Sequence, residues 1–222
     1  TYGTIFTSLM KENKLTSEGI IIDDSRPTTA KTRVIADHQH VVRIDKEKKE
    51  YLNDLMQKKL IDFIKKNIKK FDGIILQDYN KGVLTPDVIQ NVINLADQNN
   101  VLITVDPKFN NFFNYKNVTV FKPNRKEAED VLGKKIKTDK DISQAGKELL
   151  DRLEAKYVLL TLGADGIAVF EKGKEEKRMP TKARKVADVS GAGDTVISTL
   201  TVALAAGANI IEASYLANYA GG

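Results

Sequence analysis

The chain has 222 residues, of which 41% are hydrophobic and 29% charged, and these proportions are those of an ordinary soluble globular protein with one α/β domain. It contains no cysteine, which excludes disulfides and thiolate metal sites and fits a cytoplasmic protein. No apolar run approaches the ~20 residues of a membrane helix, and the lysines behind the net charge of +5 are scattered beside acids, so we expect neither a membrane nor a nucleic acid as partner.

The hydrophobic pattern predicts strands that alternate with helices. Residues 33–45 carry β-branched side chains in partial alternation, which indicates extended strand structure. Thr85 and Pro86 are typical of a helix start, with the threonine as cap and the proline at the first helical position. The predicted helices cover residues 51–70, 85–99, 124–133 and 139–153 and one more starts near residue 194; the other predicted strands are 73–78, 101–106, 118–123, 157–163 and 166–171.

Apolar strands separated by helices predict an α/β fold with a mainly parallel sheet and helices on both faces. Ligands of such sheets bind beyond the carboxyl ends of the strands, and Asp78, Asp106, Asn124 and Gly163 all follow a predicted strand. There is no internal repeat and no sign of a second domain, so we interpret residues 1–222 as one domain with its main body over 71–222. Both ends look cut, and we expect a fragment.

The most informative segment reads ADVSGAGDT over residues 187–195 and leads into a long apolar helix. Glycines let the backbone turn sharply and expose its N–H groups, and the start of a helix adds partial positive charge, so the segment predicts an anion cradle. Asp194 stands inside it. It could accept a proton from an attacking hydroxyl, or it could be an ordinary helix cap. The spacing alone leaves these two interpretations open.

The segment DVSGAGDT, with the small and apolar residues after it, resembles the C-terminal signature of the PfkB (ribokinase-like) carbohydrate kinases. The resemblance implies a ribokinase-like three-layer α/β/α fold with a small β lid, and ATP and Mg²⁺ as cosubstrate and cofactor. It also implies that Asp194 is the catalytic base and that Gly191, Ala192 and Gly193 form the anion hole.

A second motif, KPNRKE over residues 122–127, resembles the family's P-N-x-x-E element. The resemblance implies that Asn124 and Glu127 lie near magnesium and the nucleotide phosphates. Without the resemblance, the same two residues would be interpreted as a helix capping box.

A third motif, TLGADG over residues 161–166, resembles the family's T-L-G-x-x-G turn and implies that Thr161, Gly163 and Gly166 contact the nucleotide. By itself the motif predicts only a turn between two strands. Asn218 matches an asparagine near the adenine pocket of the family.

Three stretches, residues 25–45, 76–85 and 105–108, resemble the family members that phosphorylate D-glycero-β-D-manno-heptose 7-phosphate. The implied reaction transfers phosphate from ATP to O1 of that sugar and gives the 1,7-bisphosphate of ADP-heptose and lipopolysaccharide core biosynthesis. The alternatives are another sugar or sugar-phosphate kinase of the family and a non-catalytic nucleotide- or sugar-binding module with the same fold.

A substrate that already carries phosphate requires cations, and Arg33 and Lys108 are the candidates within the resembling stretches. Asp78 could hydrogen-bond sugar hydroxyls, although it could equally be a turn residue at a strand end. His38 and His40 have no third ligand at useful spacing and are interpreted as surface residues.

Some parts of the family's fold have no counterpart in the chain. They are the first strand with its sugar-binding aspartate, the N-terminal sugar motif, the end of the last helix and any adenylyltransferase domain. The lid strands of the family often join two copies, so a homodimer through residues 33–45 is a hypothesis.

Overall fold

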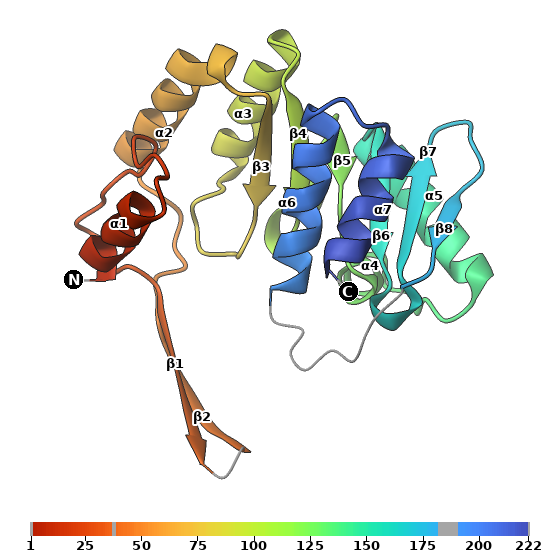
Figure 1. Cartoon of the computed structure of the whole chain (residues 1–222), viewed down its shortest axis with the longest axis horizontal. Helices are drawn as coiled ribbons and strands as arrows, with labels where there is room; N and C mark the ends of the chain where they lie inside the picture. Colours follow the sequence, from red (N-terminus) through yellow and green to blue (C-terminus); the bar gives the residue numbers. More distant parts are fainter. Residues whose placement is uncertain (1, 37–38, 182–190, 222) are drawn as a thin grey trace.

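The computed structural model describes residues 2–36, 39–181 and 191–221. Its centre is a six-stranded sheet in which the strands follow one another in sequence order (Figure 1). The first four strands are parallel, and the last two each run antiparallel to their neighbour. The strands are β3 (Gly73–Gln77), β4 (Leu102–Asp106), β5 (Val120–Phe121), β6 (Tyr157–Thr161), β7 (Ile167–Glu171) and β8 (Lys177–Met179).

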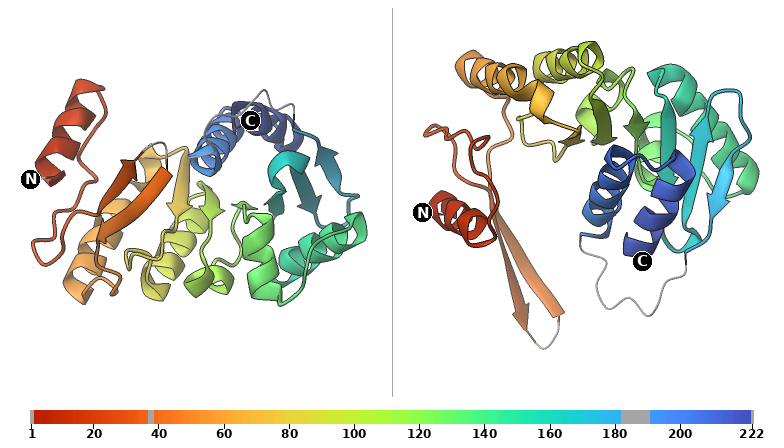
Figure 2. Two further views of the ribbon diagram at one scale, coloured as in Figure 1. Left: turned by 90° about the horizontal axis from the view of Figure 1, so that it is seen from below. Right: turned by 45° about the horizontal axis from the view of Figure 1, so that its top comes forward.

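Helices cover both faces of this sheet, as expected. Right-handed crossovers between parallel strands that advance in one direction place all connecting helices on one face. The opposite face is covered by the two last helices (Figure 2). The helices of the first face are α2 (Asp54–Asn67), α3 (Pro86–Gln98), α4 (Arg125–Leu132) and α5 (Asp139–Leu153), and those of the second face are α6 (Ala192–Ala205) and α7 (Ile210–Gly221).

The strands divide their side chains between two hydrophobic clusters. On β5, Val120 packs into the cluster with α6 and α7, while its neighbour Phe121 belongs to the cluster with α3 and α5. On β6, Leu159 belongs to the cluster with α6 and α7, and Leu160 belongs to the cluster with α3 and α5. This alternation is the period of two of a strand that is buried on both faces.

The local signals at helix ends are confirmed. Thr85 caps α3 and accepts a hydrogen bond from the Val88 N–H, with Pro86 as the first helical residue. Asn124 caps α4, and Gly133 ends it in the left-handed conformation. The predicted helix over 51–70 begins at Asp54 instead, because the Asn53 side chain caps it, and it ends in a 3₁₀ turn, η1 (Ile68–Lys70).

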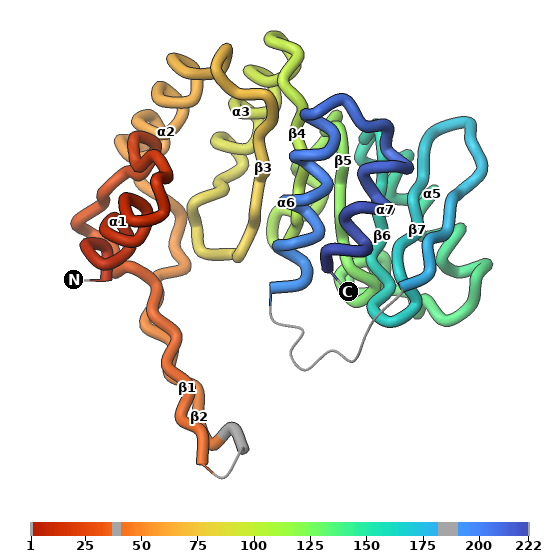
Figure 3. The backbone as a smooth tube through the Cα atoms, viewed as in Figure 1, coloured from red at the N-terminus to blue at the C-terminus, as the bar shows by residue number. Residues whose placement is uncertain are grey.

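Residues 33–45 form two strands rather than one. β1 (Ala30–Ala36) and β2 (Gln39–Lys46) pair in antiparallel fashion as a hairpin that extends away from the body (Figures 1 and 3). Directly paired residues lie on the same face of a hairpin. Arg33 faces Arg43, and Val34 faces Val42, so the hairpin has a charged face and an apolar face.

Several elements had no sequence signal strong enough to predict them. They are the short β8, the N-terminal helix α1 (Tyr2–Glu12), in which no residue is buried, and the 3₁₀ segments η2 (Phe109–Asn114) and η3 (Gly163–Asp165). Conversely, β5 has only two residues of the predicted 118–123. Among the described residues, no helix combines the length and the apolar character that would let it cross a membrane.

Candidate functional site

Asp194 lies in the first turn of α6, at the carboxyl edge of the sheet. Gly191, with a φ of +85°, is the cap residue, so the helix starts two residues earlier than predicted. Asp194 is the third helical residue, and the interpretation of Asp194 as the cap is therefore wrong. Its exposed carboxylate accepts a hydrogen bond from the Tyr79 hydroxyl, which lies 3.2 Å from both carboxylate oxygens. Asp188, Val189 and Ser190, the first part of the predicted turn, lie outside the described residues.

A buried ion pair lies beneath the glycine turn. The Lys122 ammonium is 3.0 Å from the Asp106 carboxylate, and the two side chains are only 3% and 9% exposed. The second oxygen of Asp106 accepts a hydrogen bond of 2.9 Å from the Gln77 amide. A Cβ placed on Gly193 would lie 3.8 Å from both the Asp106 oxygen and the Lys122 nitrogen, so the start of α6 rests directly on this pair.

The sequence contained a signal for this pair that the motifs did not reveal. Gln77 pairs with Asp106 across β3 and β4, and Lys122 follows β5 two residues after Val120, which faces α6. A period of two therefore puts the three polar side chains on the face that α6 covers. Lys122 and Tyr79 are the site residues that sequence reasoning missed.

Asp78 is placed at the end of β3 as predicted, but it is only 3% exposed. One carboxylate oxygen accepts the Asn80 N–H at 2.7 Å, and the other accepts the buried Tyr115 hydroxyl, also at 2.7 Å. In this structure Asp78 shapes the loop that carries Tyr79. Its direct contact with a sugar stays a prediction.

Asn124, Glu127 and Lys108 form a second cluster, past the ends of β4 and β5. Asn124 and Glu127 make the reciprocal bonds of a capping box, each of 2.9 Å, and the other Glu127 oxygen forms an ion pair with Lys108. Burial alone would lower the pKa of Lys108, but Glu127 and the more distant Asp106 and Asp78 outweigh it and raise that pKa. Lys108 therefore stays a cation.

The side chains of this cluster offer a metal ion few ligands of their own. Within the described residues, no three side chains of the His, Asp or Glu type gather around a point that could hold a metal ion. Magnesium commonly takes one or two protein carboxylates and otherwise binds phosphate and water. The Glu127 carboxylate, which already lies against the cation of Lys108, fits a magnesium ion of that kind.

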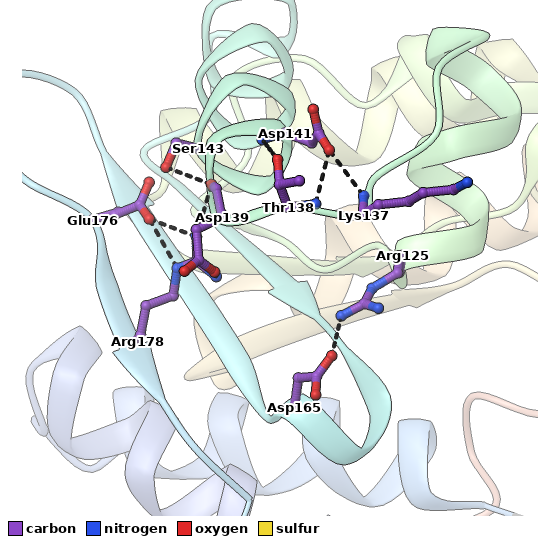
Figure 4. A network of polar contacts seen from close by, with 9 residues as sticks. All are labelled: Arg125, Lys137, Thr138, Asp139, Asp141, Ser143, Asp165, Glu176 and Arg178. Atoms are coloured by element: carbon purple, nitrogen blue, oxygen red, sulfur yellow. Dashed lines mark hydrogen bonds and ion pairs between the residues drawn. The ribbon is translucent and has the colours of Figure 1, made fainter.

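The 161–166 turn lies beside this cluster. Thr161 forms an isolated parallel bridge with Asn124, and the N–H of Gly166 donates to the Gly163 carbonyl at 3.0 Å. Arg125, the first residue of α4, points toward the turn and binds Asp165 at 2.5 Å (Figure 4). The same view shows the capping box of α5, where Thr138 and Asp141 bind each other's backbone.

The remaining predicted residues are placed in separate regions. Asn218, on α7, donates to the Pro180 carbonyl at 3.1 Å, at the end of β8. Arg33 is exposed on the hairpin, and none of the described contacts joins it to Asp194 or Glu127. His38 and the side chain of His40 lie outside the described residues.

Known proteins resemble this chain over most of its length. The profile of the pfkB family carbohydrate kinases matches residues 1–222. Two curated relatives named Bifunctional protein HldE are 41% identical over 214 residues (Nitratiruptor sp., 95% of this chain and 45% of the relative) and 42% identical over 218 residues (Helicobacter pylori strain HPAG1, 98% and 47%). The chain thus spans a little under half the length of these relatives.

Solved structures of lower identity share the fold. The tetrameric inhibited form of phosphofructokinase-2 from Escherichia coli superposes with a TM-score of 0.80 at 19% identity, over 99% of this chain and 72% of that one. Arabidopsis thaliana ribokinase complexed with ribose and ATP gives a TM-score of 0.68 at 21% identity, over 88% and 62%.

Proposed function

The chain belongs to the pfkB family of carbohydrate kinases, and we propose that it transfers the γ-phosphoryl group of ATP to O1 of D-glycero-β-D-manno-heptose 7-phosphate. The observation that carries the proposal is the position of Asp194, exposed in the first turn of α6 and above the buried Lys122–Asp106 pair. The relatives named Bifunctional protein HldE, at 41–42% identity, support the heptose assignment. So do the stretches 25–45, 76–85 and 105–108.

In the proposed reaction, the sugar hydroxyl gives its proton to the Asp194 carboxylate as its oxygen bonds to the γ-phosphorus. The bond from that phosphorus to the bridging oxygen breaks, and its electron pair leaves with ADP. The backbone N–H groups of Gly191, Ala192 and Gly193 would stabilise the transferring oxygens, and each such donor typically contributes about 3 kcal/mol in the transition state. The Lys122 ammonium lies beneath them, where it is paired with the Asp106 carboxylate.

The nucleotide would lie along the carboxyl edge of the sheet, from Asn124 to Gly163. Thr161, Gly163 and Gly166 would hold its phosphates, and Asn218 would lie near the adenine. Magnesium, when bound, neutralises phosphate charge there, and Asn124 and Glu127 would hold it. Lys108 is paired with Glu127 and would be free to contact a phosphate if that carboxylate held a metal ion.

The charged face of the hairpin suits a substrate that carries its own phosphate. Arg43, Lys81 and Lys108 form ion pairs with carboxylates, whereas Arg33 and Lys31 form none among the described residues. The Lys31 ammonium lies 6.0 Å from the centre of the Tyr79 ring, and the hydroxyl of that ring binds Asp194. A phosphate bound by Arg33 and Lys31 would leave the far end of the sugar near Asp194.

The apolar face of the same hairpin supports a homodimer. Val34, Val42 and Ile44 are 42–58% exposed, and an isolated two-stranded sheet is at best marginally stable in water. Pairing of this face with the same hairpin of a second copy would bury these side chains in a two-fold contact.

We place the enzyme in the cytoplasm, where ATP is available.

The test is ATP consumption by the full-length protein with a panel of sugars and sugar phosphates that includes the heptose 7-phosphate. Turnover with that heptose alone supports the whole proposal. Turnover with a different sugar keeps the mechanism at Asp194 and removes the heptose assignment. A lack of ATP consumption with every sugar of the panel would favour a non-catalytic binding module.

A further inference from the structure

Tyr79 contacts Asp194 although the two residues are 115 positions apart in the chain. The phenol can only donate to a carboxylate, and its oxygen lies 3.2 Å from both Asp194 oxygens. Burial and then the Asp194 charge raise the pKa of Tyr79, so the hydroxyl keeps its proton at neutral pH. The hydroxyl therefore lies across both oxygens of the carboxylate.

The loop that carries Tyr79 is fixed from within. Asp78, immediately before it, binds Tyr115 and the Asn80 N–H and is buried. The Asn80 backbone has a φ of +53°, a left-handed conformation that asparagine tolerates better than most residues. The position of the tyrosine thus follows from the buried Asp78 rather than from its own exposed ring.

The same loop is attached to Glu50 and Leu52, which follow β2 and form the base of the hairpin. Arg26 donates to the carbonyls of Lys81 and Glu50 and so bridges the two segments. Gly82 lies so close to the hairpin base that a Cβ would come within 1.9 Å of the Glu50 carbonyl oxygen, and its own carbonyl accepts the Leu52 N–H at 2.9 Å. The loop is therefore held by contacts independent of Asp194.

We propose that Tyr79 is a positioning residue, which orients the Asp194 carboxylate and occupies the place between its two oxygens where a water molecule would otherwise bind. The proposal rests on the function proposed above, in which Asp194 is the base. A carboxylate has about four lone-pair sites, so the sugar hydroxyl can bind one oxygen while Tyr79 keeps the other. A water molecule, which lacks the binding contacts of a sugar, has no comparable means of displacing the phenol.

The unwanted reaction is ATP hydrolysis. In it a water oxygen bonds to the γ-phosphorus, its proton passes to Asp194, and ADP leaves with the electron pair of the broken bond. Removing the Tyr79 hydroxyl should speed this reaction, since the lone pairs of Asp194 that the phenol occupies become open to water. The same change should slow transfer to the sugar, since the carboxylate loses its orientation.

The experiment compares Tyr79→Phe with the full-length wild-type protein, with Tyr2→Phe as matched control because Tyr2 is an exposed tyrosine of α1. We expect Tyr79→Phe to raise ATP hydrolysis without sugar about 10-fold and to lower kcat for the sugar by a similar factor, the size of one hydrogen bond to a charged group. The KM for ATP should not change. A folding defect would not increase hydrolysis.

The double variant Tyr79→Phe/Asp194→Asn separates the possible failures. Loss of the extra hydrolysis in the double variant supports the inference, because it shows that the extra hydrolysis needs Asp194. If Asp194→Asn is inactive but Tyr79→Phe hydrolyses ATP like the wild type, the role of Tyr79 is refuted and the proposed function stands. Full activity of Asp194→Asn would overturn both.

Discussion

Lys122 and Asp106 form a 3.0 Å ion pair almost wholly closed to solvent, directly below the glycine turn that begins α6. A buried pair gains little net stability over an apolar pair of similar volume, but loss of one partner leaves an uncompensated charge. The pair therefore adds little to the stability of the core as long as it is intact. It lies at the point where the cradle for the transferred phosphoryl group would lie.

The first prediction concerns this pair. Lys122→Met should lower the free energy of unfolding by about 3–5 kcal/mol, while the double variant Lys122→Met/Asp106→Asn should recover most of that loss. Urea unfolding of both single variants and the double variant gives the coupling energy. Losses that simply add would show that the two charges do not depend on each other.

The second prediction concerns Asp194. Asp194→Asn should leave folding and ATP binding nearly intact and should lower turnover by at least ~10²-fold, because the proton acceptor is lost. The matched control is Asp87→Asn, which changes an exposed aspartate in the first turn of α3. Steady-state kinetics and calorimetric ATP titration decide the matter. Equal turnover of Asp194→Asn and the wild type would remove Asp194 as the base.

The third prediction separates metal binding from helix capping. Glu127 and Asp141 are the third helical residues of α4 and α5, and each closes the capping box of its helix. Glu127→Gln and Asp141→Asn should both cost some stability, but only Glu127→Gln should weaken the magnesium dependence of ATP binding. ATP titrations at a series of magnesium concentrations measure this. An unchanged magnesium dependence in Glu127→Gln would leave the residue with its capping role alone.

The fourth prediction is a pH dependence at Tyr115. Burial, then the Asp78 charge, raises the pKa of Tyr115 above its usual 10.0, so folded Tyr115 keeps its proton at a pH where the unfolded chain releases it. Its contribution to stability is therefore complete below pH 10 and decreases as pH rises further. Tyr115→Phe should cost about 1–3 kcal/mol at neutral pH, since buried Asp78 loses a donor.

Above pH 10, the difference in unfolding free energy between the wild type and Tyr115→Phe should become smaller. Urea unfolding at a series of pH values from neutral upward tests this. A difference that stays constant through the alkaline range would contradict the assignment of a raised pKa to Tyr115.

The fifth prediction concerns the two faces of the hairpin. Arg33→Gln should raise the KM for the sugar phosphate and leave the oligomeric state unchanged, because it removes a cation from the charged face. Ile44→Lys should shift the protein toward monomer in sedimentation experiments, because it puts a charge on the apolar face, where Ile44 is 58% exposed. Each variant is the control for the other, and a monomeric wild type would refute the dimer.

Features that depend on near neighbours in the chain could be predicted from the sequence. Thr85 and Pro86 start α3, and Asn124 with Gly133 delimits α4, because a cap is made by a side chain and backbone groups a few residues away. The GAGD motif likewise indicated the start of a helix, while the anion cradle at that start stays a prediction. The mainly parallel sheet followed from apolar strands that alternate with helices.

Other features were decided only by the tertiary structure. The cap of α6 is Gly191, with a φ of +85°, rather than Asp194, and the Asp194 carboxylate binds the hydroxyl of Tyr79 on another segment. The partners of Lys122 and Asp78 also lie on other segments. Such contacts depend on which strands are neighbours and in which register they pair, and a single sequence does not specify either, because hydrophobic periodicity gives the face of a strand but not its partner.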